Sequence, residues 1–302
     1  MGKSTFEFSV SSVTINGEST VINITQDNNT YTHKILHEFG EITSLPAGTM
    51  EFEWKPTATE LTKFLEEIPN QKTRSIDVYL DTYDGEILVG RDIHALTVTL
   101  STSTGSPAYI GTPTIKDNNS VTNSMGVILP GKSNISVSDY STTRFGAKIV
   151  KKCYTYTFNN KEYEYPSVLF LLLSLPLTDT PKSYDIGFKL VDSRGFEKKT
   201  TVKKTCAKYS NPTIDIFEIV RCDSNGNETE AGTKAKVITK GSWSYLNGKN
   251  TAAFKIGYKL QTETEYTYIT QTVSNGIVDY EQILNLTLNS DSDYLFAVSL
   301  AD

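Results

Sequence analysis

The sequence predicts an all-β protein built of three tandem sandwich modules, and two observations carry this prediction. A strand-like passage that ends in aspartate occurs twice, at residues 184–192 and again at 294–302. Alternating polar and apolar runs, bounded by Gly, Asn, Asp and Pro, recur roughly every 8 to 12 residues. In modules of roughly 100 residues, this spacing is typical of immunoglobulin-like or fibronectin-like β-sandwiches.

Prolines mark the boundaries between the expected modules. The chain has 302 residues, which is enough for two or three domains of ordinary size. Pro113 and Pro212 are each followed by Thr-Ile and a new alternating run, and proline is favoured at strand starts because it lacks a ladder donor. We therefore expect three modules, at 1–105, 106–209 and 210–302.

In the first module, one short helix is expected to interrupt the strands. Strands are expected at residues 6–15, 19–25, 31–38, 50–54, 75–84 and 97–100. Thr57-Ala-Thr-Glu60 is a capping box, in which the Thr57 hydroxyl accepts from a first-turn amide while Glu60 reaches back. Apolar residues then recur at helical spacing until Pro69, which predicts a helix over 57–68 that closes one end of the sandwich.

The middle module contains a candidate contact surface. Asn159-Asn-Lys-Glu162 lies between two aromatic strand-like runs and predicts a hairpin. With Asn160 and Lys161 as its loop, Phe158 faces Tyr163 and Tyr156 faces Tyr165. We interpret this aromatic ladder as a candidate surface for sugar rings or a partner protein, and the alternative is sandwich core or an ordinary Tyr-rich sheet surface. The residues of the ladder are Tyr154, Tyr156, Phe158, Tyr163 and Tyr165.

Residues 168–176 form the longest apolar run of the chain, VLFLLLSLP. The run is under half of the roughly 20 residues that a membrane helix needs. Membrane insertion is therefore not expected, and the run predicts a fully buried strand.

The repeated passage ends differently in its two copies. After Asp192 the chain continues through Ser193, Arg194 and Gly195 towards another strand, whereas the second copy stops at Asp302. We interpret the first ending as a tight structural turn, with Gly195 at positive φ and Arg194 pairing locally; a binding tip is the alternative. The third module lacks a matching final strand, so one sheet edge is expected to be unpaired or filled by an external strand.

No residue pattern points to catalysis, a metal or a cofactor. His33 and His37 lie in a strand-like run, which separates their side chains by about 13 Å and disfavours a shared metal. His94 is isolated, and the acidic segment 223–230 does not fit a calcium loop, because Gly226 stands at its fourth position. Three cysteines without paired short spacing indicate neither disulfides nor zinc. We expect a protein that is not an enzyme.

Charge is distributed unevenly around a net value of −6. The three expected modules carry 7 basic against 15 acidic residues, then 15 against 8, then 7 against 12. Such asymmetry orients a protein against neighbours of opposite sign or holds an anionic polymer on the middle module. The alternative is that the lysines solvate and protect sheet edges. We find no motif for nucleic-acid binding.

Several motifs, taken in order, resemble one family. Trp54-Lys-Pro56 and the segments around Tyr83-Asp-Gly85 are similar to the first module of minor structural proteins in long-tailed phages, the siphoviruses, of Gram-positive bacteria. Phe145-Gly-Ala-Lys-Ile149, Val191-Asp-Ser-Arg-Gly195 and Gly248-Lys-Asn250 resemble the later modules of that family. The resemblance implies a tail or baseplate component of tandem immunoglobulin-like domains, without catalytic residues.

From this resemblance we expect a structural component of the virion tail, assembled in the cytoplasm of the bacterial host. The expected partners are other phage tail proteins, with cell-wall glycan or a surface polymer as a further ligand and a homo-oligomer left open. One alternative is an adhesion module whose main role is to recognise a host glycan. A weaker alternative is a bacterial surface adhesin, which the lack of a signal-like start disfavours.

Overall fold

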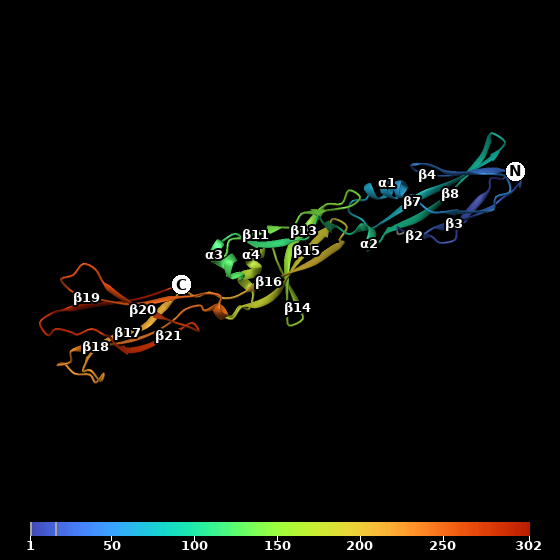
Figure 1. Cartoon of the computed structure of the whole chain (residues 1–302). Helices are drawn as coiled ribbons and strands as arrows, with labels where there is room; N and C mark the ends of the chain where they lie inside the picture. The colour runs from blue at the N-terminus through green and yellow to red at the C-terminus, as the bar shows by residue number, and fades with distance from the viewer. Residues whose placement is uncertain (1, 16) are drawn as a thin grey trace. The chain divides into compact units, whose positions relative to one another are not determined.

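The computed structural model describes residues 2–15 and 17–302, and it is built mainly from antiparallel β-sheets (Figure 1). The predicted fold class, tandem immunoglobulin-like β-sandwiches, is confirmed. Two compact units can be distinguished. The first comprises the residues up to 114 with 138–167 and 187–202, and the second comprises 115–137, 168–186 and 203–302. The finer division into three modules stays a prediction.

The N-terminal sandwich consists of two sheets that share one core. The first sheet has the order β1-β3-β6, with β1 (Thr5–Phe8), β3 (Thr20–Thr25) and β6 (Glu51–Trp54). The second has the order β2-β8-β7-β4-β5, with β2 (Ser12–Ile15), β4 (Thr32–His37), β5 (Gly40–Leu45), β7 (Thr73–Asp84) and β8 (Ile87–Leu100). Alternate residues of each strand point inward, so that Ile22, Ile76 and Val78 are fully buried between the sheets.

Helix α1 (Ala58–Glu66) packs against this core. The Thr57 hydroxyl accepts from the Glu60 backbone N–H, and the Glu60 carboxylate accepts from the Thr57 backbone N–H in return. Phe64 and Leu65 on the inner face are fully buried among the strand residues. Their burial explains why a helix of nine residues is stable here, since isolated helices of this length are marginal.

A third sheet has the order β14-β13-β15-β16. Its strands are β13 (Ile149–Phe158), β14 (Lys161–Tyr165), β15 (Lys182–Asp192) and β16 (Glu197–Cys206). Short elements accompany it, namely α2 (Thr102–Gly105), β9 (Ala108–Tyr109), β10 (Thr114–Asp117), α3 (Ser120–Met125), β11 (Ile135–Ser138) and β12 (Ser141–Thr142). Among these, β9 pairs with β12 and β10 pairs with β11.

The apolar run at 168–176 forms a helix, so the predicted buried strand was wrong. Helix α4 (Val168–Ser174) buries Leu171 and Leu172, whereas Leu169 and Leu173 are 50% and 58% exposed. The run is apolar at almost every position, and such a pattern has no periodicity that could separate a short strand from a helix.

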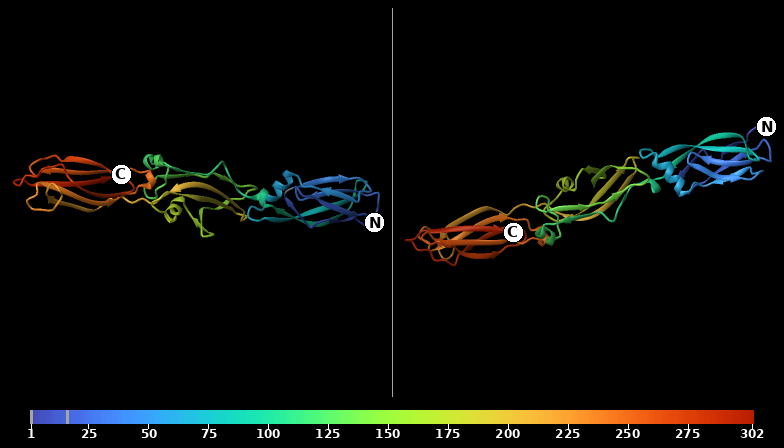
Figure 2. Two further views of the ribbon diagram at one scale, coloured as in Figure 1. Left: turned by 60° about the horizontal axis from the view of Figure 1, so that its bottom comes forward. Right: turned by 90° about the horizontal axis from the view of Figure 1, so that it is seen from above.

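The C-terminal sandwich also consists of two sheets packed face to face (Figure 2). One has the order β17-β18-β21, with β17 (Thr213–Cys222), β18 (Lys234–Ser242) and β21 (Ile277–Ile283). The other has the order β20-β19-β22, with β19 (Ala253–Leu260), β20 (Thr267–Thr272) and β22 (Tyr294–Ala301). The short helix η1 (Leu246–Gly248) precedes β19. Within the described part of the chain, β22 pairs with β19 alone and forms a sheet edge.

The turn between β15 and β16 reaches into the N-terminal sandwich. Asp192 Oδ1 accepts from the backbone N–H groups of Arg194 and Phe196, and Gly195 has a φ of 78°. The turn places Phe196, which is 5% exposed, in the core of the N-terminal sandwich beside Leu100. A residue from far along the chain thus completes the first core.

Arg194 fastens the same turn to helix α1. Its guanidinium donates to the carbonyls of Leu65 (3.1 Å) and Ile68 (3.2 Å), near the C-terminal end of the helix. It also donates to the carbonyls of Arg144 (2.8 Å) and Phe145. The expectation that Arg194 pairs locally was wrong. The last carbonyls of a helix lack intrahelical partners, and a cation there satisfies them and interacts favourably with the helix dipole.

Substitution of Arg194 tests this contact. Arg194→Lys is expected to lower the free energy of unfolding by about 2 to 4 kcal/mol, because one ammonium cannot serve four carbonyls and each buried carbonyl left without a donor costs roughly 1 to 3 kcal/mol. Urea denaturation followed by circular dichroism measures the change. Arg221→Lys, which removes one bond to the Gly232 carbonyl, is the matched control. A loss no larger than that of the control would contradict the role of Arg194.

Candidate functional site

The aromatic hairpin of β13 and β14 has its loop one residue earlier than predicted. Asn159 and Asn160 form the loop, with φ angles of 49° and 62°. A two-residue type I′ turn needs positive φ at both central positions, which Asn accepts far more readily than Lys. The predicted loop of Asn160 and Lys161 was therefore wrong.

The earlier loop changes which aromatic residues face each other. The predicted pairs of Phe158 with Tyr163 and of Tyr156 with Tyr165 were wrong, because the shifted loop moves each cross-strand partner by two residues. The observed pairs are Tyr154 with Tyr165, Tyr156 with Tyr163, and Phe158 with Lys161. All five aromatic side chains nevertheless lie on one face, because residues two apart on a strand and residues directly opposite each other share a face.

The inner end of this aromatic face belongs to the core. The Tyr154 ring packs edge-on against Phe188 with centroids 5.4 Å apart, and its hydroxyl donates to Asp139 Oδ2 at 3.0 Å. Burial, together with the Asp139 carboxylate, raises the pKa of Tyr154 to about 12. Tyr154 therefore serves packing and is unsuited to contact a ligand.

The outer end of the same face is open to solvent. Phe158 and Tyr163 are 44% and 38% exposed, and Tyr156 stacks on Phe158 with centroids 6.3 Å apart and ring planes at 21°. The Lys161 ammonium lies 5.1 Å from the centroid of the Tyr163 ring. The candidate contact surface thus narrows to Tyr156, Phe158 and Tyr163, which we call the hairpin platform.

A network of ion pairs covers the opposite face of these strands. Lys189 Nζ lies 2.7 Å from Glu164 and 3.0 Å from Glu197, and Lys151 also contacts Glu164. Hydrogen bonds from Lys151 and Lys189 lower the pKa of Glu164 to about 2. Sequence reasoning missed this network because its members come from four different strands and become neighbours only in the sheet.

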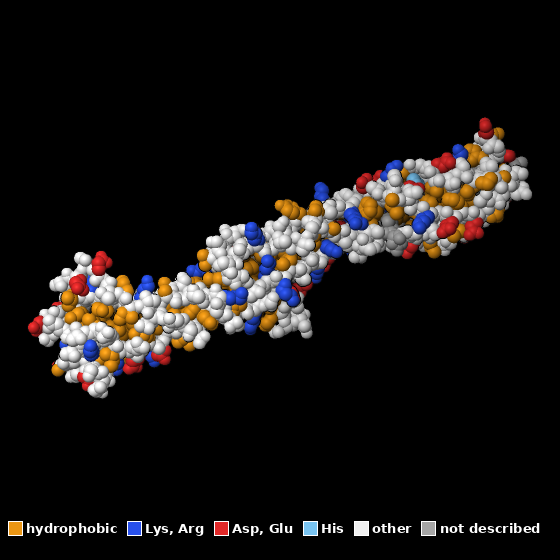
Figure 3. All heavy atoms as spheres, viewed as in Figure 1, with side chains coloured by type: hydrophobic (Ala, Val, Ile, Leu, Met, Phe, Trp, Pro, Cys, Tyr) orange, Lys and Arg blue, Asp and Glu red, His pale blue; other side chains and the backbone are white. Residues whose placement is uncertain are grey.

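The basic middle segment is partly neutralised by its own acidic residues. Figure 3 shows Lys and Arg side chains gathered over the middle part of the sequence and Asp and Glu side chains towards both ends. Lys199 lies 2.9 Å from Glu162, and Lys152 lies 2.6 Å from Asp139. Only part of this positive charge is therefore available to an anionic partner.

The histidines have separate partners. His33 Nε2 lies 2.9 Å from Ser4 Oγ. The Phe39 backbone N–H donates to His37 Nδ1, so His37 Nε2 carries the proton and donates to Glu60 Oε1 at 2.9 Å. Across residues 2–15 and 17–302, no group of three or more His, Cys, Asp or Glu side chains could hold a metal ion.

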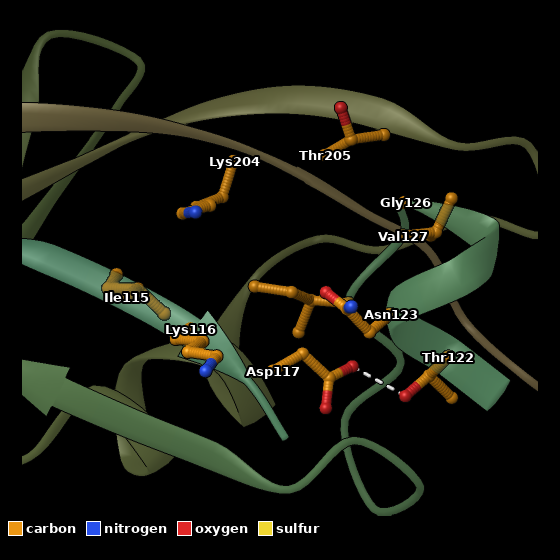
Figure 4. A pocket seen from close by; sticks show the side chains of 10 residues that line it. Ile115, Lys116, Asp117, Thr122, Asn123, Gly126, Val127, Lys204 and Thr205 are labelled. Carbon is orange, nitrogen blue, oxygen red and sulfur yellow. Dashed lines mark hydrogen bonds between the residues drawn. The ribbon is translucent and has the colours of Figure 1, made fainter. Parts of the chain in front are cut away.

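A cavity of about 190 Å³ opens beside Asp117 in the second unit (Figure 4). Asp117 Oδ1 accepts from the backbone N–H groups of Asn119 and Asn134, each at 3.0 Å. Its Oδ2 accepts from the Thr122 hydroxyl at 2.5 Å. Burial raises the pKa of Asp117, but the hydrogen bonds from Ser133, Thr122 and the two backbone amides together bring it below its ordinary value.

The Asp117 carboxylate thus holds the loop before α3 and has little capacity left for a ligand. Sequence reasoning missed it, although Asp117-Asn-Asn-Ser120 has the side-chain oxygens that cap turns and helix starts.

The chain matches a known protein-family model. A family model described as "Siphovirus protein of unknown function (DUF859)" matches residues 3–294. The chain matches none of the curated proteins. Among the described residues, none of the helices is long and apolar enough to span a membrane.

Solved structures similar to this chain include three tandem proteins. The FN1–FN3 domains of chicken CNTN1 are 10% identical, with 100% of this chain and 93% of that chain covered and a TM-score of 0.24. Dpr2 Ig1–Ig2 in complex with DIP-Theta Ig1–Ig3 is 10% identical, with coverages of 97% and 98% and a TM-score of 0.33. A tetra-tandem repeat in the extending region of a large adhesion protein is 10% identical, with coverages of 100% and 74% and a TM-score of 0.28.

The depressed pKa of Asp117 predicts a pH dependence of stability. The carboxylate contributes stability above its unfolded pKa of about 3.9, and this contribution is lost as the pH falls through the lower folded pKa. Asp117→Asn should therefore lower the melting temperature clearly at neutral pH and progressively less below about pH 4.

Thermal denaturation of both proteins across this pH range measures the effect. Asp291→Asn, at an exposed loop position, should track the unmodified protein throughout. A deficit of Asp117→Asn that stays constant with pH would show that the charge of Asp117 is not involved.

Proposed function

The chain belongs to the family of siphovirus proteins whose model matches residues 3–294, and on that premise we propose that it is a non-catalytic structural component of the phage tail or baseplate. In this proposal the protein is a tail component of the virion and is assembled in the cytoplasm of the bacterial host. The motifs that resemble minor structural proteins of siphoviruses support the tail in particular.

One observation carries the structural role, namely that each unit contains a connection between stretches of chain far apart in sequence. In the first unit, Phe196 enters the N-terminal core and Arg194 holds the end of α1. In the second unit, the Asp302 carboxylate accepts from the Tyr209 hydroxyl at 2.8 Å and from Asn250 Nδ2 at 2.6 Å. Connections of this kind suit a component that carries load rather than one that turns over a substrate.

A hydrophobic cluster supports the connection in the second unit. Leu246 of η1 is 1% exposed and packs with Val127, Leu129 and Ala207. Lys249 Nζ also donates to the Met125 carbonyl at 3.0 Å. The segment of chain that leads into the third predicted module is therefore held by apolar packing and by a hydrogen bond.

The partners in this proposal are other tail proteins and, in a multimeric assembly, further copies of this chain. The alternation of acidic, basic and acidic segments favours a fixed orientation against neighbours of opposite charge. Many weak contacts multiplied over the copies on one particle produce high avidity without a deep pocket.

The location is tested on purified virions. We expect the chain to be found in the particles by mass spectrometry, with gold-labelled antibodies against it binding to the tail or its tip in electron micrographs. The proposal would be refuted if the chain were abundant in lysates of infected cells but missing from purified particles.

Adhesion to the host surface is a second candidate function, and the hairpin platform favours it. Stacked and exposed rings beside a lysine can pack on the apolar face of a sugar, and aromatic residues are enriched at contact surfaces. In this proposal cell-wall glycan or a surface polymer of the host is the ligand.

Removal of the two exposed rings tests the platform. Phe158→Ala combined with Tyr163→Ala should reduce binding of the purified protein to host cell walls about tenfold, since aromatic contacts contribute roughly 0.5 to 1.5 kcal/mol each beyond their buried area. Tyr268→Ala, at a 55% exposed position of β20, is the matched control. Unchanged binding with the fold intact would rule out this surface.

A further inference from the structure

We propose that the second unit has a binding site for a neutral saccharide, in the cavity beside Trp243 and Tyr245. The cavity has a volume of about 380 Å³ and is lined by residues near the ends of β18 and β20, by the linker at 210–211 and by Asp179. Ligand sites have volumes of roughly 300 to 1,000 Å³, so one or two sugar rings fit. The inference is independent of the hairpin platform, whose residues belong to the first unit.

An aromatic pair forms one wall of this cavity. Trp243 is 6% exposed and meets Tyr245 edge-on, with ring centroids 5.4 Å apart and ring planes at 87°. The indole is therefore fixed in place, while Tyr245 is only half-buried. The partly exposed Tyr245 ring, supported by the buried indole, offers an apolar surface to the C–H groups of a sugar.

Polar side chains surround the same cavity. Asp179, Asn247 and Asn275 are exposed and line it, and among the described residues none of the three side chains has a hydrogen bond or an ion pair with the protein. An amide offers both a donor and an acceptor, and a carboxylate offers acceptors on two oxygens. These are the groups that pair with the hydroxyls of a saccharide.

The charge of the lining selects a neutral ligand. None of the residues that line the cavity is Lys or Arg, and Asp179 contributes a negative charge. By contrast, Lys116 and Lys204 line the cavity beside Asp117. The Lys132 ammonium, which donates to Asn211 Oδ1 of the lining at 3.1 Å, balances the charge of Asp179, so the site is close to neutral overall and favours an uncharged sugar over an anionic one.

The rim of the cavity is held in an unusual backbone conformation. Leu246, Asn247 and Asn275 have φ angles of 51°, 55° and 59°, in the left-handed region that residues other than glycine seldom adopt. The Trp243 backbone N–H donates to the Gly276 carbonyl at 3.0 Å, which ties the two rim segments together. Such strain persists where the surroundings fix it, and a rim fixed in advance lowers the entropic cost of binding.

Saturation-transfer NMR on the full chain tests the site. The probes are glucose, galactose, rhamnose and N-acetylglucosamine at about 5 mM, a concentration suited to weak sugar affinity, with glucose 6-phosphate as the anionic probe. We expect at least one neutral sugar to give a clear signal and glucose 6-phosphate to give a weaker one than glucose.

The decisive variant is Asn247→Gly with Asn275→Gly. Glycine accepts positive φ without cost, so the substitutions remove the two amides and keep the backbone conformation. The affinity for the sugar, measured from the concentration dependence of the saturation-transfer signal, should fall about tenfold, the loss expected when hydrogen bonds worth about 1.4 kcal/mol disappear. Asn159→Gly with Asn160→Gly, at the left-handed loop of the hairpin, is the matched control and should bind like the unmodified chain.

Three results would overturn the proposal. The first is that no neutral sugar binds. The second is that the rim variant, Asn247→Gly with Asn275→Gly, binds as well as the control. The third is that glucose 6-phosphate binds more tightly than glucose. Loss of binding with Phe158→Ala and Tyr163→Ala, but not with the rim variant, would assign sugar binding to the hairpin platform instead.

Discussion

The four carbonyls that receive hydrogen bonds from Arg194 come from two places, the end of α1 and the segment before β13. Phe145, one of the acceptors, has a φ of 51°, so the contact also fixes a left-handed residue. Gly105 leaves space for the Phe196 ring of the same turn, because a Cβ on residue 105 would lie 2.7 Å from that ring. The connection between the β15–β16 turn and the N-terminal sandwich depends on this one guanidinium and on the Phe196 ring.

The repeated passage is used differently in its two copies, although each ends a strand in aspartate. Asp192 organises a turn by accepting from backbone N–H groups, whereas Asp302 accepts from the side chains of Tyr209 and Asn250. In each unit the aspartate lies at a connection between distant parts of the chain. The two copies therefore share a strand pattern, and the residues around each aspartate determine which contacts it makes.

Local signals explain what could be predicted from the sequence. The capping box at Thr57 and Glu60 and the period-2 alternation of strands such as β7 act over a few residues and are visible without a structure. The acceptors of Arg194 and the ion pairs of Glu164 depend on contacts between distant strands, so no local pattern shows them. The hairpin loop lies one residue earlier than predicted, because positive φ at both loop positions favours Asn159 and Asn160 over Lys161.

The position of Phe196 has a consequence for synthesis of the chain. When residues 1–105 have left the ribosome, the N-terminal sandwich still lacks one ring of its core, and that ring is translated about 90 residues later. At roughly 5 to 20 residues per second, the interval lasts about 5 to 20 s. During this time the nascent sandwich exposes an apolar gap, so closure of the first core is coupled to the emergence of the turn after β15 rather than to the end of its own strands.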